Sequence, residues 1–226
     1  MTHKRQYLLD DLLKQTPIQV LSGKLADPVT VSGLASDSRS VQPGDLFVAL
    51  VGGSADGHQY IPAAVERGAA AVLGTRADVA CAVPYLQVAD TRPALAYLTA
   101  AMQDFPARKL TVIGVTGTDG KTTTSNLLYQ ILLAAGLRAG IISTVNAVIG
   151  DEVVDTGFHV TTPEAPDVQR YLRQMVDAGL THVVLETTSH GLAQHRVTGC
   201  EYDIAVVTNV THEHLDYHGT YEQYLA

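Results

Sequence analysis

The stretch from Leu110 to Thr124, Leu-Thr-Val-Ile-Gly-Val-Thr-Gly-Thr-Asp-Gly-Lys-Thr-Thr-Thr, limits the fold more than any other part of this chain. An apolar, β-branched run leads into a glycine-rich turn, and Lys121 and Thr122 begin a helical pattern directly afterwards. Gly117 and Gly120 can adopt backbone angles closed to other residues, so successive N–H groups can converge on a phosphate. The helix adds unpaired N–H donors and the positive end of its dipole. This order of strand, turn and helix predicts a nucleotide triphosphate site.

Two side chains of this segment suit the ligand directly. Lys121 supplies a full positive charge for the outer phosphates, and the Thr122 hydroxyl suits a Mg²⁺ ion. The pattern is the short variant G-x-x-G-K-T, because Val115 stands where the longer phosphate-loop pattern has its first glycine. A strand-to-helix turn with glycines for geometry alone is the alternative, and the Lys-Thr pair in this context favours the nucleotide site.

Composition narrows the class of protein. The chain has 226 residues and a net charge of −8, which argues against non-specific nucleic-acid binding. Cys81 and Cys200 lie far apart without a C-x-x-C partner, which indicates reduced thiols. No stretch approaches the length of a membrane span and no apolar leader follows the basic N-terminus, so we expect a cytoplasmic protein without membrane insertion.

The first half of the chain reads as short α and β pieces. The pattern predicts a buried strand over 45–51, a helix over 58–67, strands over 70–73 and 85–88, and a helix capped by Thr91 that continues to about Phe105. Pro106–Lys109 reads as a linker. We therefore expect an N-terminal domain over 1–107 and a second domain over 108–226.

From Leu110 onwards, apolar strands alternate with helices. We expect strands over 110–115, 139–143, 182–186 and 204–208, and helices over 122–135, 166–178 and from about Thr220. This alternation predicts an α/β fold with a mostly parallel sheet and helices on both faces, after a small N-terminal α/β domain. Ligands of such sheets bind at the carboxyl ends of the strands. Three polar segments, 117–121, 186–189 and 209–214, should therefore converge on one edge.

Two of these segments carry candidate metal ligands. Glu186 ends a buried strand and can meet a cation held by phosphates, although a solvated loop charge is the alternative. Arg196, ten residues later in the same polar run, can fork onto a carboxylate or phosphate or form a surface ion pair. The run from Thr208 to Gly219 partly fits the H-x-H-x-D-H zinc pattern, but Tyr217 stands where the last histidine belongs. A role for His214 beside a Mg²⁺ site is favoured over zinc.

Small polar residues and glycines also follow the first-half strands. Ser36-Asp-Ser-Arg39, Gly44-Asp-Leu-Phe47 and the run from Gly52 to Gly57 suit a polar ligand such as a nucleotide-sugar, and suit plain turns equally.

Taken together, these motifs resemble the Mur ligase family. The resemblance rests on T-G-T-D-G-K-T-T-T, T-T-P-E, E-T-T-S-H-G-L-A-Q-H-R and T-N-V-T-H-E-H-L-D-Y-H-G, and it covers nearly the whole chain. The D-S-R, G-D-L-F-V-A and A-D-G of the first half favour the MurE type. The resemblance implies an N-terminal domain that binds a UDP-sugar, a central ATPase domain and a C-terminal domain that receives an amino acid.

The same resemblance implies an activity and its cofactors. ATP would phosphorylate the D-glutamate carboxylate of UDP-N-acetylmuramoyl-L-alanyl-D-glutamate with Mg²⁺ as the metal ion. A diamino acid, meso-diaminopimelate or L-lysine, would then attack the acyl phosphate to form an amide. We expect the complete enzyme to be monomeric.

The resemblance also assigns site residues. The ATP phosphates would be held by the phosphate loop, residues Thr116, Gly117, Thr118, Asp119, Gly120, Lys121 and Thr122. The Mg²⁺ ions would be bound by Thr122, Glu186 and His214, and the catalytic residues would be Lys121, Glu186 and His214. The UDP-sugar peptide would be bound by Ser38, Thr161, Thr162, Thr188, Gln194 and Arg196.

Three features depart from the family pattern. Asp119 stands where the family has Asn, and Thr187-Thr188-Ser189 stands where the MurE type commonly has Val-Ser-Ser. The chain stops at Ala226, in the helix where the family carries a carbamylated lysine, so we expect an incomplete central domain, no C-terminal domain and no ligation by this chain alone. Alternatives are another Mur-type ligase, a non-catalytic nucleotide- or UDP-sugar-binding module and, more distantly, a metal-dependent hydrolase.

Overall fold

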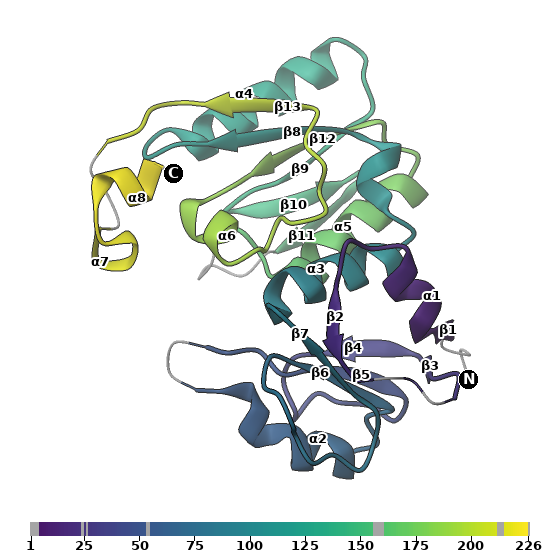
Figure 1. Ribbon diagram of the computed structural model, residues 1–226. Coiled ribbons are helices and arrows are strands. Elements are labelled where there is room, and N and C mark those ends of the chain that lie inside the picture. The colour runs from purple at the N-terminus through teal and green to yellow at the C-terminus, as the bar shows by residue number, and fades with distance from the viewer. Residues whose placement is uncertain are drawn as a thin grey trace. The chain divides into compact units, whose positions relative to one another are not determined.

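The computed structural model describes residues 5–23, 25, 27–52, 55–155, 161–211 and 215–225. The chain divides into two compact units, 1–102 and 103–226, and each combines one main β-sheet with helices (Figure 1). Among the described residues, no helix combines the length and apolar character needed to cross a membrane.

The first unit is built around a five-stranded sheet. Its strand order is β2-β7-β6-β5-β4, with β4 to β7 parallel and β2 antiparallel. These strands are β2 (Val20–Ser22), β4 (Gly33–Ala35), β5 (Asp45–Val48), β6 (Ala71–Gly74) and β7 (Tyr85–Val88). A separate antiparallel pair and three helices complete the unit: β1 (Tyr7–Leu8), β3 (Thr30–Val31), α1 (Leu9–Lys14), α2 (Ile61–Glu66) and α3 (Thr91–Met102).

Apolar packing explains how these elements are held. Ile61 and Ala64 of α2 pack into a buried cluster with Phe47 of β5 and Val72 of β6. All four residues of β5 and of β6 are buried, as expected for central parallel strands.

Four predictions about the first unit were wrong in detail. The strand expected over 45–51 ends at Val48, and the helix expected to continue to about Phe105 ends at Met102. The helix expected over 58–67 begins as a 3₁₀ helix, Gly57–Tyr60, and becomes α2 only at Ile61. Asp90, not Thr91, caps α3, because its carboxylate accepts the Arg92 N–H at 2.8 Å. Thr91 is already helical, and its hydroxyl donates to the carbonyl of Ala49 at 3.3 Å.

The second unit is built around a six-stranded sheet with the order β11-β10-β9-β12-β8-β13. Its four parallel strands were predicted, and they are β8 (Thr111–Thr116), β9 (Ala139–Ile142), β12 (His182–Glu186) and β13 (Ile204–Val207). An unpredicted antiparallel hairpin, β10 (Asn146–Ile149) and β11 (Glu152–Asp155), adds the other two strands at the edge beyond β9. The sheet is therefore mostly parallel.

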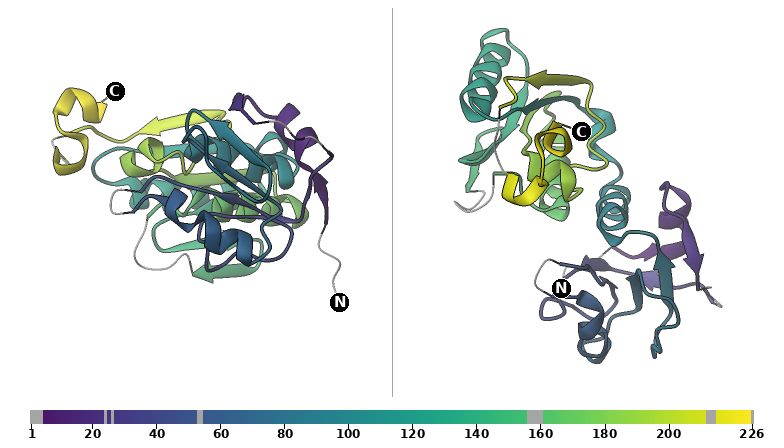
Figure 2. Two further views of the ribbon diagram at one scale, coloured as in Figure 1. Left: turned by 60° about the horizontal axis from the view of Figure 1, so that its bottom comes forward. Right: turned by 60° about the vertical axis from the view of Figure 1, so that its left-hand side comes forward.

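Helices cover both faces of this sheet, as predicted (Figures 1 and 2). Leu128 and Leu132 of α4 (Lys121–Ala134) pack against Val184 on one face. Leu172 and Met175, from α5 (Ala165–Asp177), lie in the buried cluster of the other face. Among the described residues, the unit also has three short α-helices: α6 (Ser189–Ala193), α7 (Leu215–His218) and α8 (Tyr221–Leu225).

The residues expected to form a linker have a different structure. Pro106–Lys109 is a 3₁₀ helix that contacts α5, and Pro106 and Ala107 are buried. Both cysteines are free thiols; Cys200 is fully buried, and burial raises its pKa to about 12.

Candidate functional site

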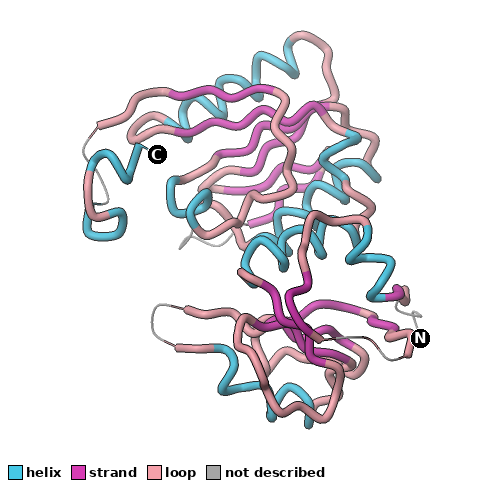
Figure 3. The backbone as a smooth tube through the Cα atoms, viewed as in Figure 1, coloured by secondary structure: helices cyan, strands magenta, loops and turns pink. Residues whose placement is uncertain are grey.

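Three polar segments meet at the carboxyl ends of neighbouring strands in the second unit. Strand β8 lies between β12 and β13, and all three run parallel, so the loops after Thr116, Glu186 and Val207 leave the same edge (Figure 3). Hydrogen bonds join the loop after β8 to the described part of the loop after β13, and join α4 to Glu186. The predicted convergence of these segments is confirmed for the described residues.

The phosphate loop after β8 has the geometry that its glycines allow. Gly117 and Gly120 have φ values of 135° and 81°, in the range that favours glycine. A Cβ on Gly117 would lie 2.2 Å from the Thr208 hydroxyl, so the loop also approaches the β13 side too closely for a side chain. Lys121 closes the loop, because its Nζ donates to the carbonyls of Gly117 at 2.9 Å and Thr118 at 2.7 Å.

The first part of this loop is fastened to the segment after β13. The N–H of Thr118 donates to the Asn209 carbonyl, and the N–H of Asp119 donates to Asn209 Oδ1, each at 2.9 Å. The Thr118 hydroxyl accepts the Thr211 N–H at 2.9 Å and lies 3.0 Å from the Tyr224 hydroxyl. The first three amides of α4, those of Lys121 to Thr123, precede the first hydrogen bond of the helix, which the Thr124 N–H donates to the Gly120 carbonyl at 2.9 Å.

Glu186 lies at the end of β12 and is fully buried. Its carboxylate accepts three hydrogen bonds: from the hydroxyls of Thr122 at 2.8 Å and Thr144 at 2.9 Å, and from the Thr144 N–H at 3.0 Å. These donors are neutral, and among the described residues no cationic side chain forms an ion pair with Glu186. Since burying a carboxylate without an opposite charge costs free energy, the arrangement suits a cation between Thr122 and Glu186.

Most of the predicted substrate residues gather beside Glu186. The buried Thr162 hydroxyl lies 3.1 Å from the Thr188 hydroxyl and accepts the Thr188 N–H at 3.1 Å. The Arg196 side chain, 13% exposed, donates to the Thr162 carbonyl at 2.8 Å and to Gln194 Oε1 at 2.7 Å. It also pairs with Glu164 at 3.0 Å. This polar cluster of Thr162, Thr188, Gln194 and Arg196, with Thr161 next to it in the chain, orients a guanidinium near the end of β12.

Asp119 is exposed, and only its backbone is fixed by the Asn209 contacts. Ser38 belongs to the first unit, in the turn after β4, and is 8% exposed. His214 lies outside the described residues, and so does most of the H-x-H-x-D pattern. Its role as a metal ligand stays a prediction.

Two further residues hold this site: Thr144, which was not predicted, and Asn209, which was predicted only as the first residue of the polar segment 209–214. Thr144 follows β9 and binds Glu186, and Asn209 follows β13 and binds the phosphate loop. Both are polar residues just after apolar strands, which is the signal that had singled out Glu186.

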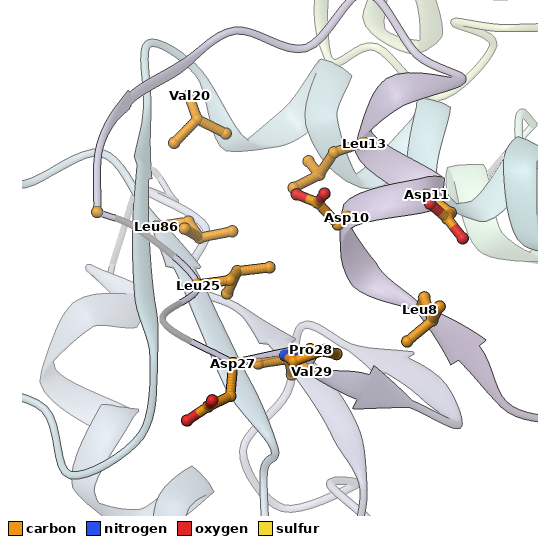
Figure 4. Close-up of a pocket in the computed structure, with 11 residues that line it drawn as sticks. Leu8, Asp10, Asp11, Leu13, Val20, Leu25, Asp27, Pro28, Val29 and Leu86 are labelled. Carbon is orange, nitrogen blue, oxygen red and sulfur yellow. The ribbon is translucent and has the colours of Figure 1, made fainter.

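A cavity of about 520 Å³ lies elsewhere, within the first unit (Figure 4). Apolar side chains of Leu8, Leu13, Val20 and Leu86 line it, together with Asp10 and other residues. None of the predicted site residues lines this cavity.

Comparison with known proteins decides the family. The model of the Mur ligase middle domain matches residues 115–226, and that of the Mur ligase family, catalytic domain, matches residues 30–103. The chain belongs to the Mur ligase family. The first match therefore begins inside the strand that leads into the phosphate loop, and it extends over Glu186 and Arg196.

Individual Mur ligases give a consistent result. The chain is 50% identical over 198 residues to the UDP-N-acetylmuramyl-tripeptide synthetase of Roseiflexus sp. (strain RS-1). The aligned region covers 86% of this chain and 39% of that protein. A solved UDP-N-acetylmuramoyl-L-alanyl-D-glutamate–2,6-diaminopimelate ligase has a TM-score of 0.78 at 30% identity, over 97% of this chain and 43% of that one. MurF ligase from Thermotoga maritima, solved in complex with ADP, has a TM-score of 0.53 at 27% identity, over 85% of this chain and 40% of that one. The chain thus spans about two fifths of the length of these relatives.

Proposed function

We propose that this chain is the UDP-sugar-binding and ATP-binding part of a MurE-type, ATP-dependent amide ligase. The enzyme would add a diamino acid to UDP-N-acetylmuramoyl-L-alanyl-D-glutamate through an acyl-phosphate intermediate, in peptidoglycan precursor synthesis. The observation that carries the proposal is the contact at 2.8 Å between the Thr122 hydroxyl, at the mouth of the phosphate loop, and the buried Glu186 carboxylate. The choice of substrate is supported by two relatives, a UDP-N-acetylmuramyl-tripeptide synthetase and a UDP-N-acetylmuramoyl-L-alanyl-D-glutamate–2,6-diaminopimelate ligase.

The phosphate tail of ATP would lie at the mouth of the loop, against the first amides of α4. On binding, Lys121 Nζ would exchange its two backbone carbonyl partners for phosphate oxygens, which offer it a full negative charge. The Asn209 contacts leave the loop preshaped, so little conformational entropy is lost when the nucleotide binds.

Thr122 and Glu186 would hold Mg²⁺. A hydroxyl and a carboxylate are the hard oxygen donors that this ion prefers, and His214 is the further ligand that the family pattern proposes. When bound, the ion supplies positive charge between the phosphates and the carboxylate that is to be phosphorylated.

The polar cluster beside Glu186 would bind the peptide end of the UDP-sugar substrate. The Arg196 guanidinium is held in one orientation by Thr162 and Gln194, so it would exchange its ion pair with Glu164 for a substrate carboxylate without first losing rotamer freedom. Thr161, Thr162 and Thr188 would add hydroxyl partners, and Ser38 would contact the UDP-sugar from the first unit.

A nucleotide-binding experiment tests the core of this proposal. The affinity of the purified chain for a fluorescent ADP analogue is measured with excess Mg²⁺ and with EDTA. Lys121→Ala should weaken binding in both conditions, whereas Glu186→Gln should remove most of the Mg²⁺-dependent gain. Lys14→Ala is the control, because Lys14 is exposed in α1 and pairs only with nearby aspartates among the described residues. Nucleotide binding that is unaffected by Lys121→Ala would overturn the proposal.

A further inference from the structure

Thr144 contributes two of the three hydrogen bonds that the Glu186 carboxylate accepts. Its hydroxyl donates to Oε1 at 2.9 Å, and its backbone N–H donates to Oε2 at 3.0 Å. Because the two donors of one residue reach both oxygens, they fix the rotation of the carboxylate plane as well as its position. Thr122 reaches only Oε1, at 2.8 Å.

The turn that carries Thr144 is itself held in place. Between β9 and β10, the Ser143 N–H donates to the Asn146 carbonyl at 2.9 Å, and the Ser143 hydroxyl donates to the same oxygen at 3.1 Å. The Ser143 hydroxyl also accepts the Val145 N–H at 3.3 Å, and Ser143 is fully buried. The donors of Thr144 therefore come from a fixed turn, which is the kind of support that a metal ligand needs.

From this geometry we infer that Thr144 is a positioning residue that sets Glu186 in its cation-binding orientation. The inference rests on the proposed function, in which Thr122 and Glu186 hold the Mg²⁺ of a bound nucleotide. An ionised carboxylate has about four acceptor sites, so three hydrogen bonds leave one free for a cation. The Thr122 hydroxyl can keep its hydrogen bond to Glu186 while an oxygen lone pair faces the ion.

The hydroxyl of Thr144 is the part that can be tested. Without it, Oε1 keeps one donor instead of two, and the carboxylate can rotate about the remaining contacts. Replacing the hydrogen-bonding partner of a metal ligand typically weakens metal binding by about 10- to 100-fold. We expect an effect near the lower end, because the backbone N–H of Thr144 remains in every variant.

The experiment compares two matched pairs of chains: wild type with Thr144→Val, and Thr144→Ser with Thr144→Ala. Within each pair the main difference is the hydroxyl, and the loss of the γ-methyl group is common to both members of the second pair. For each chain, the Mg²⁺ concentration for half-maximal enhancement of ADP-analogue binding is measured, together with the affinity in EDTA. Thr111→Val, at the opposite end of β8 from the site, is the control.

The valine and alanine variants should need about tenfold more Mg²⁺ than their hydroxyl-bearing partners. Affinity in EDTA should stay the same in all chains. A folding defect would lower that affinity as well, so this measurement separates it from a loss at the metal site. If neither pair differs in its Mg²⁺ requirement, the role of Thr144 is refuted while the proposed function stands. If the wild-type chain binds nucleotide without any Mg²⁺ dependence, the metal site and this inference fail together.

Discussion

The side-chain amide of Asn209 holds the peptide groups around Asp119 at two points. Its Oδ1 accepts the Asp119 N–H at 2.9 Å, and its Nδ2 donates to the Asp119 carbonyl at 3.2 Å. The two residues are 90 positions apart, and they meet because β8 and β13 are neighbours in the sheet. The shape of the phosphate loop, which follows β8, thus depends on the segment that follows the neighbouring strand β13.

Asn209→Ala should weaken nucleotide binding without unfolding the chain. The variant loses both side-chain hydrogen bonds to Asp119 but keeps the backbone contact between Thr118 and residue 209. At about 1 kcal/mol for a hydrogen bond, a five- to thirtyfold weaker affinity for the ADP analogue is the rough expectation. Hydrogen exchange at the Asp119 amide should be faster. Unchanged affinity together with unchanged exchange would show that Asn209 does not support the loop.

Asp119→Asn should leave nucleotide affinity equal or improve it. The exposed carboxylate lies in the phosphate loop, where it repels the phosphates at short range, and an amide of the same shape removes this repulsion. Any gain should be largest at low salt and shrink as ionic strength rises, because exposed charges are screened. A large loss of affinity on this substitution would mean that Asp119 takes part in binding, for example through a metal ion.

The phosphate loop could be predicted from the sequence because all of its parts are contiguous. The positions of its glycines, Lys121 and Thr122 in the turn follow from their spacing in the sequence. The buried strand before them can be predicted without knowing which strands lie beside it. The ends of β12, His182–Glu186, were predicted correctly for the same reason, since an apolar run stops at a charged residue. Glu186 could therefore be assigned to the sheet edge from its position alone.

Thr144 and Asn209 could not be assigned roles in the same way. Each acts on a residue at the end of another strand, so the role of Thr144 depends on the pairing of β9 with β12, and that of Asn209 on the pairing of β8 with β13. Thr144 depends further on the turn between β9 and β10, which the sequence analysis did not predict. The capping error at Thr91 arose because Asp90 and Thr91 are both good caps, and the hydrogen bond from the Thr91 hydroxyl to the distant Ala49 carbonyl cannot be read from the sequence.

Gly114→Ala should destabilise the second unit. A Cβ at this position of β8 would lie 2.7 Å from Cε1 of Tyr202, whose ring is fixed by a hydrogen bond of 2.6 Å between its hydroxyl and that of Thr187. Overpacking of this kind costs about 1–3 kcal/mol in the free energy of unfolding, which urea titration can measure.

A double mutant separates this overpacking from other effects of alanine. In a Tyr202→Ala background the ring is gone, so Gly114→Ala should cost little and the two substitutions should be strongly coupled. Additive effects would show that the Tyr202 ring is not the reason for glycine at position 114.

The contribution of the Asp56 charge to the stability of the first unit should be lost in acid. Its carboxylate accepts the His58 backbone N–H at 2.9 Å, contacts the His58 ring and pairs with Arg76. The backbone and side-chain hydrogen bonds of His58 lower the pKa of Asp56 from 3.8 to about 2. A carboxyl group with a lowered pKa in the folded state stabilises the fold above its unfolded-state pKa, and this contribution disappears as the pH falls through the folded-state value.

The difference in unfolding free energy between wild type and Asp56→Asn should therefore be constant above about pH 5 and shrink between about pH 4 and 2. Asparagine keeps an oxygen for the His58 N–H, so the pH-dependent part reports the charge. Urea unfolding of both chains at several pH values gives this difference directly, and a difference that does not change between pH 4 and 2 would rule out a lowered pKa at Asp56.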